Sequence, residues 1–156
     1  MIEIRKAAEA DIDSIIEIEN EAITPAWTHG MLLNEIYRDD AHFELACEGA
    51  KIIGFYILRE ISGESELLQI AVAEAARRCG IGGELMKACL VRALKNRISK
   101  VHLEVRSKNG AAISMYEKHG FINAGKRKSY YTQPEDDAII MTKKIPAGAE
   151  NDNTVN

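Results

Sequence analysis

The sequence has few cysteines, no long apolar run and no excess of positive charge, and each absence excludes a class of protein. Its three cysteines are odd in number and show no disulfide or metal-ligand spacing, which predicts a reduced, cytoplasmic protein. No uncharged stretch approaches the roughly 20 residues that a membrane-spanning helix needs. Residues 1–14 also lack the apolar core of a signal peptide. We therefore expect neither a membrane nor an export role.

Charge and histidine content exclude further classes. The net charge of −4 argues against a general affinity for nucleic acid. The four histidines show no metal-ligand spacing, so no metal site is expected. The length predicts one domain over residues 1–145, and a hydrophobic fraction of 46% is ordinary for a protein with a real core. The remaining tail, residues 146–156, is small and polar and is expected to be disordered.

What the sequence does contain is a strand, a glycine loop and a helix between Leu67 and Leu94. Residues 67–72 follow a period of two and are apolar on both faces apart from Gln69, which predicts a strand covered on both sides. From Glu84 the apolar residues recur at helical spacing. The glycines of the intervening loop are Gly80, Gly82 and Gly83.

The junction of this loop with the helix predicts an anion-binding site. The first turn of a helix presents N–H groups without internal partners, and glycines let a phosphate approach the backbone closely. Arg77 and Arg78 add positive charge just upstream. Alternatively, Gly80 only ends the connector while Gly82 and Gly83 permit close packing. The GxxxxGK of a Walker loop and the N-terminal GxGxxG of a dinucleotide-binding unit are both absent from the sequence.

The rest of the chain predicts an α/β layer around one central sheet. The order is strand, two helices, three strands, helix, strand, helix and two strands. The strands are expected at residues 2–4, 42–47, 52–59, 67–72, 101–106, 121–132 with an interruption before 126, and 138–144; the helices are expected at residues 9–21, 28–37, 84–94 and 110–118.

Two motifs resemble a known family. Residues 77–82 read RxxGxG, which is similar to the pyrophosphate loop of acetyl-CoA-dependent N-acetyltransferases of the GNAT superfamily. Residues 101–121, VHLEVRSKNGAAISMYEKHGF, resemble the signature LEVRxSNxxAxxLYxxxGF of bacterial ribosomal-protein-alanine N-acetyltransferases. Lys108 stands where that signature has serine. Residues 25–27 resemble the PW motif of this family and residues 127–141 its RxxYY and DAIIM segments, so the resemblance covers essentially the whole expected domain.

This resemblance implies a fold and an activity. The fold is the single-domain GNAT fold, a central mixed sheet of about seven strands flanked by about four helices. The activity is transfer of an acetyl group from acetyl-CoA to the N-terminal α-amine, an alanine, of a small-subunit ribosomal protein, by direct transfer in a ternary complex. The cosubstrate is therefore acetyl-CoA, and the partner is the N-terminus of a ribosomal protein.

The resemblance also implies binding roles, carried over position by position. The cofactor-binding residues are Ile70, Ala71, Val72, Arg77, Arg78, Cys79, Gly80, Ile81, Gly82, Gly83 and Asn109. Trp27, Tyr130 and Tyr131 would line the peptide groove, although Trp27 could instead pack the second helix on the sheet. Direct transfer needs no acyl-cysteine, so Cys79 would be incidental; a reactive thiol is the alternative.

Glu104 and Tyr116 are the implied catalytic residues. Acetyl transfer to an amine requires a base that deprotonates the ammonium and an acid that protonates the departing thiolate. The resemblance assigns the first role to Glu104 and the second to Tyr116. Without it, a paired surface charge at Glu104 and a core side chain at Tyr116 are the simpler interpretations.

Two other functions stay open on the sequence. A GNAT enzyme for lysine side chains or small-molecule amines would keep the glycine loop, Glu104 and Tyr116 but would not require the PW, YY and DAIIM segments. A non-catalytic acyl-CoA-binding module would not need the acid and the base. The acidic residues 135–137 either attract a basic peptide or form an ordinary solvated turn.

Overall fold

The computed structural model describes residues 1–146, and the tail expected to be disordered lies, from residue 147, outside the described residues. The elements in chain order are β1 (Ile2–Lys6), the 3₁₀ turn η1 (Glu9–Asp11), α1 (Ile12–Ala22), α2 (His29–Tyr37), β2 (Ala41–Glu48), β3 (Lys51–Ile61), β4 (Glu64–Val72), the 3₁₀ turn η2 (Glu74–Ala76), α3 (Ile81–Lys95), β5 (Lys100–Arg106), α4 (Gly110–Lys118), β6 (Ile122–Thr132) and β7 (Glu135–Lys144). The predicted α/β class and order of elements are confirmed.

The seven strands of the described residues form one mixed sheet in the order β1-β2-β3-β4-β5-β7-β6. β4 and β5 run parallel, with Ser65 opposite Val101 and Glu66 opposite His102. The pairs β1–β2, β2–β3, β5–β7 and β6–β7 are antiparallel. The predicted mixed sheet of seven strands is therefore confirmed. None of the helices within residues 1–146 is long and apolar enough to cross a membrane.

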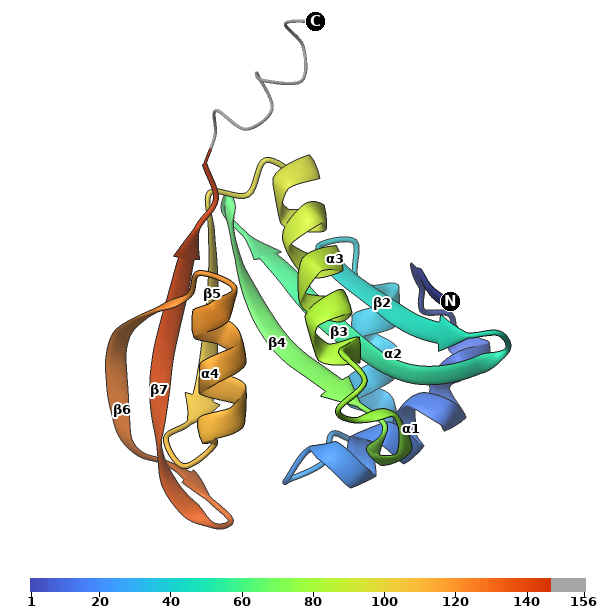
Figure 1. Ribbon diagram of the computed structural model, residues 1–156, viewed down its shortest axis with the longest axis horizontal. Coiled ribbons are helices and arrows are strands. Elements are labelled where there is room, and N and C mark those ends of the chain that lie inside the picture. The colour runs from blue at the N-terminus through green and yellow to red at the C-terminus, as the bar shows by residue number, and fades with distance from the viewer. Residues whose placement is uncertain (147–156) are drawn as a thin grey trace, which may run out of the picture. The chain divides into compact units, whose positions relative to one another are not determined.

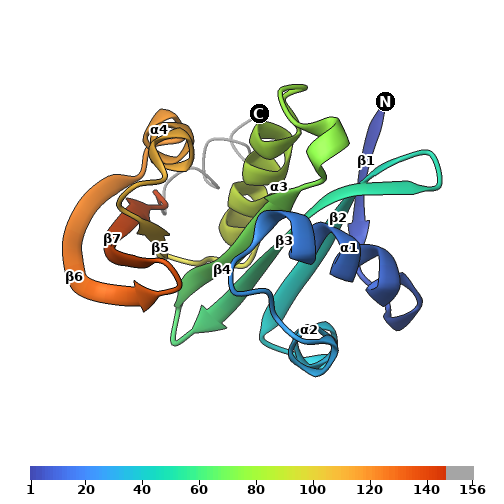
Figure 2. The ribbon, with the colours of Figure 1, turned by 90° about the horizontal axis from the view of Figure 1, so that it is seen from below.

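The chain divides into two compact units, which are described separately. Unit 1 comprises Met1–Arg59 and Leu67–Cys89, and unit 2 comprises Glu60–Glu66 and the residues from Leu90 onward. In unit 1, α1 and α2 cover one face of β2 and β3, and the first part of α3 covers the other (Figure 2).

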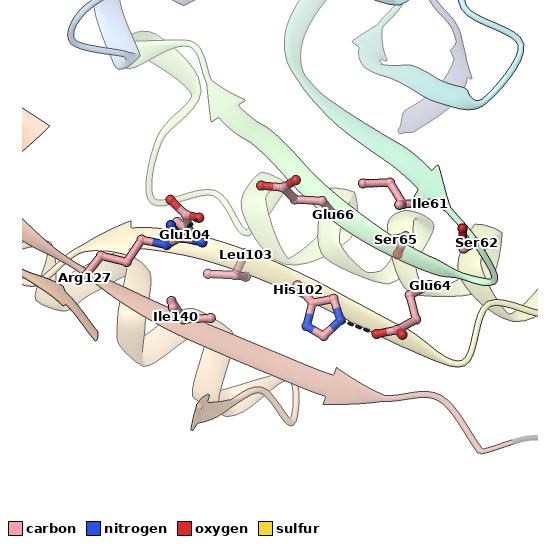
Figure 3. Close-up of a pocket in the computed structure, with 10 residues that line it drawn as sticks. All are labelled: Ile61, Ser62, Glu64, Ser65, Glu66, His102, Leu103, Glu104, Arg127 and Ile140. Atoms are coloured by element: carbon pink, nitrogen blue, oxygen red, sulfur yellow. Dashed lines mark hydrogen bonds and ion pairs between the residues drawn. The ribbon is translucent and has the colours of Figure 1, made fainter. Parts of the chain in front are cut away.

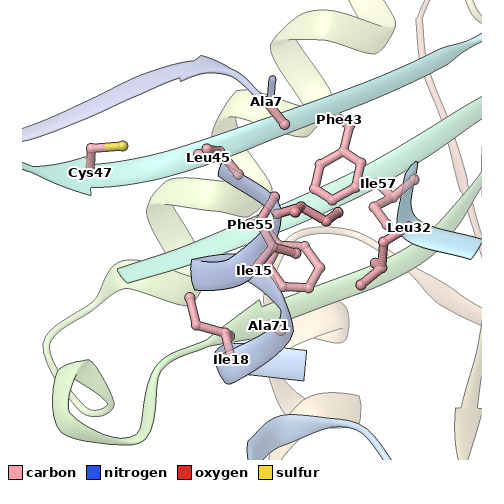
Figure 4. Close-up of a cluster of buried hydrophobic side chains, with 11 residues drawn as sticks. Ala7, Ile15, Ile18, Leu32, Phe43, Leu45, Cys47, Phe55, Ile57 and Ala71 are labelled. Atoms are coloured by element: carbon pink, nitrogen blue, oxygen red, sulfur yellow. The ribbon is translucent and has the colours of Figure 1, made fainter. Parts of the chain in front are cut away.

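The core of unit 1 lies under α1 and α2. Figure 4 shows aliphatic side chains of the two helices meeting aromatic side chains of β2 and β3. The Phe43 and Phe55 rings lie 5.5 Å apart, and Ile15 and Leu32 are fully buried against this cluster. Burying each such side chain contributes about 1.5–3 kcal/mol to folding. The amphipathic spacing predicted for both helices is thus used to build this core.

Unit 2 places β5, β7 and β6 side by side, with α4 against one face of them (Figure 1). Burial alternates along β5: Val101, Leu103 and Val105 are buried, and the residues between them are half-buried. Residues 101–106 therefore form the predicted strand, with a polar stripe along one face. Asn109 caps α4, because its side chain accepts a hydrogen bond from the N–H of Ala112 at 3.2 Å.

Helix α3 begins three residues earlier than the sequence predicted. Gly82 and Gly83 form part of its first turn, and Gly80 precedes it. A glycine costs about 1 kcal/mol relative to alanine inside a helix. Burial of Ile81 and Leu85, four residues apart and 5% and 0% exposed, outweighs that cost.

Two strands also differ from the prediction. The expected interruption in residues 121–132 is a bulge between Asn123 and Gly125 within one continuous strand, β6. In β4, Leu67, Gln69 and Ala71 are buried, but the residues between them are only half-buried. The expectation that both faces of β4 are covered is therefore met fully on one face and in part on the other, where Leu68 packs against the core of unit 1.

Three elements of unit 1 approach one another closely at Gly54. A Cβ atom on this residue of β3 would lie 2.8 Å from the carbonyl oxygen of Ala71 in β4 and 2.9 Å from Cδ1 of Leu85 in α3. The first contact is with backbone, which cannot swing aside. Any side chain at Gly54 must therefore displace β4 at residues 70–72.

We predict that Gly54→Ala lowers the free energy of unfolding by about 1–3 kcal/mol, because it overpacks this contact. Urea denaturation measures the change. Gly30→Ala in α2 is the matched control, since a Cβ there meets nothing within 4 Å, and it should stabilise the protein by up to about 1 kcal/mol. Equal effects of the two substitutions would contradict the packing described at Gly54.

Candidate active site

Glu104 lies in the wall of a cavity in unit 2. The cavity has a volume of about 400 Å³ and is lined by residues 61, 62 and 64–66 and by residues of β5, β6 and β7 (Figure 3). Its ionisable lining residues are Glu64, Glu66, His102, Glu104 and Arg127. Three carboxylates against one guanidinium make the lining acidic overall, so the cavity favours a cationic group over an anion.

The Glu104 carboxylate has two partners from β6. Its Oε1 lies 3.3 Å from Nε of Arg127, and its side chain is 21% exposed. The hydroxyl of Tyr130 also donates a hydrogen bond to Glu104, which raises the pKa of Tyr130 above its usual value. The structure thus brings the predicted base together with one predicted peptide-binding residue. Arg127 is the first residue of the RxxYY segment that resembles the family, but the sequence does not predict its pairing with Glu104.

A second pair, His102 and Glu64, lies in the same lining. Nε2 of His102 lies 2.5 Å from Oε1 of Glu64, and Nδ1 lies 2.9 Å from the hydroxyl of Thr142 (Figure 3). The hydrogen bond with His102 lowers the pKa of Glu64. Strand alternation placed His102 on the face of Glu104, but the contact with Glu64 requires the β4–β5 pairing, which the sequence does not reveal.

Tyr131 is fixed at the hairpin between β6 and β7. The Arg106 guanidinium lies 4.2 Å from the centroid of the Tyr131 ring and donates to the carbonyls of Gln133 and Pro134 at 3.0 and 2.7 Å. Burial raises the pKa of Tyr131. The rings of Tyr130 and Tyr131 lie 5.1 Å apart and nearly perpendicular, so the two predicted peptide-binding tyrosines form one aromatic surface.

Two of the acidic residues 135–137 bind neighbouring segments of the protein's own chain. Asp136 is only 7% exposed and accepts hydrogen bonds from the Ser107 hydroxyl and the Lys108 N–H. The Ser107 bond lowers the pKa of Asp136. Asp137 accepts from the N–H of Ser129 at 2.7 Å and pairs with Lys126. The loop that carries Lys108 is therefore tied to β7, and Asp136 is engaged there rather than solvated.

Tyr116, the predicted acid, lies in α4. It is 8% exposed, and its ring meets Phe121 edge-on with centroids 5.9 Å apart. Tyr116 is not among the residues that line the cavity. Its packing matches the core interpretation, and its role as the acid stays a prediction.

The glycine loop of unit 1 has the geometry of a helix-start anion site. The first hydrogen bond of α3 runs from the N–H of Glu84 to the carbonyl of Gly80 at 3.1 Å, so the amides of residues 81–83 precede the hydrogen-bonded part of the helix. Gly80 has a φ of +77° and Arg78 one of +66°. These left-handed residues turn the chain into α3.

Other predicted cofactor-binding residues lie next to this loop. The Arg77 side chain donates through Nε to the carbonyl of Val72 at 3.2 Å, which joins the loop to the end of β4. Ala71 is buried, whereas Ile70 and Val72 are half-buried. Cys79 is exposed, and its Sγ lies 3.6 Å from the carbonyl of Arg77.

Trp27, predicted to line the peptide groove, is partly buried and packs against the core of unit 1. Its backbone N–H donates to the carboxylate of Glu19 at 2.8 Å. The alternative interpretation of Trp27 as a packing residue therefore agrees with its position.

Residues 1–146 contain no group of three or more His, Cys, Asp or Glu side chains that could bind a metal ion.

Comparisons with known proteins identify the family of this chain. The sequence profile of the acetyltransferase (GNAT) family matches residues 12–121. The [ribosomal protein bS18]-alanine N-acetyltransferase of Haemophilus influenzae is 31% identical over 134 residues, which cover 84% of this chain and 90% of that protein.

Two solved structures share the fold. The ribosomal-protein-alanine N-acetyltransferase of Escherichia coli superposes with a TM-score of 0.89 at 29% identity, covering 97% of this chain and 98% of the other. The PaiA N-acetyltransferase of Thermoplasma acidophilum, solved in complex with coenzyme A, gives a TM-score of 0.78 at 26% identity, covering 93% and 99%. The chain therefore belongs to the acetyltransferase (GNAT) family.

Proposed function

We propose that this protein transfers the acetyl group of acetyl-CoA to the N-terminal α-amine, an alanine, of a small-subunit ribosomal protein in the cytoplasm. The observation that carries the proposal is the Glu104 carboxylate, held by Arg127 and Tyr130 in the wall of an acidic cavity. The relatives from Haemophilus influenzae and Escherichia coli, whose names state this activity, support it.

The loop of unit 1 suits the pyrophosphate of acetyl-CoA. The amides of residues 81–83 and the positive end of the α3 dipole favour an anion at this point, and the exposed Arg78 adds a full charge beside them. Half-burial of Ile70 and Val72 leaves the end of β4 accessible to the pantetheine arm. Acetyl-CoA supplies the acetyl group as an activated thioester.

An α-amine is a better acceptor than a lysine side chain for a single carboxylate base. Its pKa is about 8, against about 10.4 for lysine, so near neutral pH its free-amine fraction is about 250-fold larger. The acidic cavity lining attracts the ammonium form before it loses its proton. A single carboxylate base can therefore deprotonate an α-ammonium group more easily than a lysine ammonium group.

Proton transfers at two side chains would complete the reaction. Glu104 would accept one proton of the substrate ammonium, so that the neutral amine can add to the thioester carbonyl. As the carbon–sulfur bond breaks, Tyr116 would donate its proton to the departing thiolate, and the second surplus proton of the acetylated nitrogen would return to Tyr116. Asn109, which caps α4 in the loop after β5, would contact the cofactor near its sulfur.

Peptide acetylation with mapping of the product tests this function. Alanine-starting peptides with free and with blocked N-termini are incubated with acetyl-CoA, and the acetyl group is located by mass spectrometry. We expect label on the α-amine of the free peptide and none on the blocked one. Label on lysine, or no label on either peptide, would contradict the proposal.

The catalytic assignments predict two kinetic changes. Glu104→Gln should lower kcat by about 100-fold or more, since a general base contributes that much, and Tyr116→Phe should lower kcat far more than it weakens coenzyme A binding. Glu66→Gln is the matched control, because it removes a carboxylate from the same cavity without removing the base. Initial rates at saturating acetyl-CoA measure these effects; an unchanged kcat in Tyr116→Phe would remove that residue as the acid.

The phosphate assignment predicts a specific effect of Gly80→Ala. A positive φ costs a residue with a Cβ about 1–2 kcal/mol, so the loop should shift and coenzyme A should bind about tenfold more weakly by calorimetry. Gly49→Ala is matched, since Gly49 also has a positive φ, +61°, and a Cβ at either glycine meets nothing within 4 Å. Gly49→Ala should leave coenzyme A affinity unchanged. Equal weakening by both substitutions would argue against a phosphate site at Gly80.

A further inference from the structure

Glu19 is a fully buried carboxyl group near the C-terminal end of α1. Its Oε1 accepts hydrogen bonds from the backbone N–H of Trp27 at 2.8 Å and from Nε2 of Gln69 at 3.0 Å. Its backbone carbonyl accepts from the N–H of Ile23 at 2.9 Å. One residue thus holds both ends of the connector formed by residues 23–27, which joins α1 to α2.

The same turn of α1 contacts the chain on both sides of residues 70–72. Gln69, the side-chain partner of Glu19, directly precedes this segment. On the other side, the carboxylate of Glu21 accepts a hydrogen bond from the N–H of Glu74 at 3.0 Å. The connector that carries Trp27 and the strand segment proposed to bind acetyl-CoA are therefore tied to one helical turn within unit 1.

A carboxyl group at this position is costly for stability alone. Burial raises the pKa of Glu19, and the hydrogen bonds from Trp27 and Gln69 only oppose that effect. Two further buried oxygens, Oε2 of Glu19 and Oε1 of Gln69, have no hydrogen-bond partner within residues 1–146. An apolar side chain of similar volume would avoid the desolvation penalty of the Glu19 carboxyl group, although the N–H of Trp27 and Nε2 of Gln69 would then lack their acceptor. What it could not do is accept the two hydrogen bonds that orient the connector.

We propose that Glu19 is a positioning residue for the acceptor peptide: through its hydrogen bonds to Trp27 and Gln69 it fixes the connector against β4 and so sets the affinity for the peptide. This rests on the proposed function and on the expected contact of Trp27 with the peptide. Glu19 acts through its acceptor oxygen and not through its charge. A glutamine at this position can therefore replace it, whereas an apolar residue cannot.

Kinetics of three variants test the proposal. Glu19→Met removes the acceptor at similar volume and should raise the peptide KM about tenfold, the effect of losing such bonds, while coenzyme A affinity changes less than about threefold. Glu19→Gln should behave like the wild type. Glu35→Met is the matched control: it removes another buried glutamate of unit 1, which pairs with Arg59, and should lower stability without raising the peptide KM. Equal impairment by Glu19→Gln and Glu19→Met, or a raised peptide KM in Glu35→Met, would overturn the proposal.

Two measurements on Trp27 need no activity. Trp27 is the single tryptophan of the chain, so Glu19→Met should shift its fluorescence to longer wavelength and increase its quenching by acrylamide, and Glu19→Gln should do neither. In the wild type, the amide of Trp27 should exchange slowly with solvent deuterium, because it donates to a buried carboxyl group. Fast exchange, or unchanged fluorescence in a folded Glu19→Met protein, would overturn the proposed positioning. If these results hold but the wild type acetylates no peptide, the proposed function fails and the positioning of the connector stands.

Discussion

The close approach of β3, β4 and α3 at Gly54 is the packing constraint on which the candidate cofactor site depends. Gly54 lies so close to the backbone of Ala71 and to the Leu85 side chain that no further side chain fits there. This packing fixes the distance between the end of β4 and the first turns of α3. The chain between them contains the arginines and the positive-φ residues of the loop. The start of α3, where the anion site is proposed, is therefore built on a rigid contact, although the loop itself is exposed.

Binding and chemistry draw on different kinds of groups in the two units. In unit 1, the proposed phosphate site uses backbone amides at a helix start, which carry partial charge whatever the pH. In unit 2, the proposed chemistry uses side chains, with Glu104 held by Arg127 and Tyr130. The two carboxyl groups Glu19 and Glu104 illustrate the contrast. Burial isolates Glu19 from solvent and suits it to accept fixed hydrogen bonds, whereas Glu104 lines a cavity and is 21% exposed, as its proposed role as a base requires.

Much of the fold could be predicted from the sequence, because its signals are local. The alternation of β5, the Asn109 cap and the amphipathic helices each depend on residues within a few positions of one another. Helix α3 begins at Ile81 and not at the predicted Glu84, because the apolar spacing from Glu84 onward does not reveal that Ile81 is buried. The family resemblance supplied the identity of the expected anion and reaction, which periodicity and spacing alone do not determine.

The contacts that define the site could be predicted only in part, because they join residues far apart in the chain. Glu19 and Gln69 are separated by 50 positions. Arg127 reaches Glu104 through the pairing of β6, β7 and β5, and the register of β6 shifts between Arg127 and Tyr131. The hydrophobic periodicity of a single sequence does not reveal such a register shift. The sequence therefore identifies these residues as candidates, but their contact partners depend on the tertiary structure.

Acetylation of the α-amine of a ribosomal protein is the activity that we propose for this protein. The most direct test uses the small-subunit ribosomal protein bS18 of the same organism, with its native N-terminus, as substrate together with acetyl-CoA. Intact-mass and fragment-mass spectra before and after the reaction locate every added acetyl group. We predict a single acetyl group on the N-terminal alanine. An unmodified protein, or acetyl groups on lysine side chains, would contradict it.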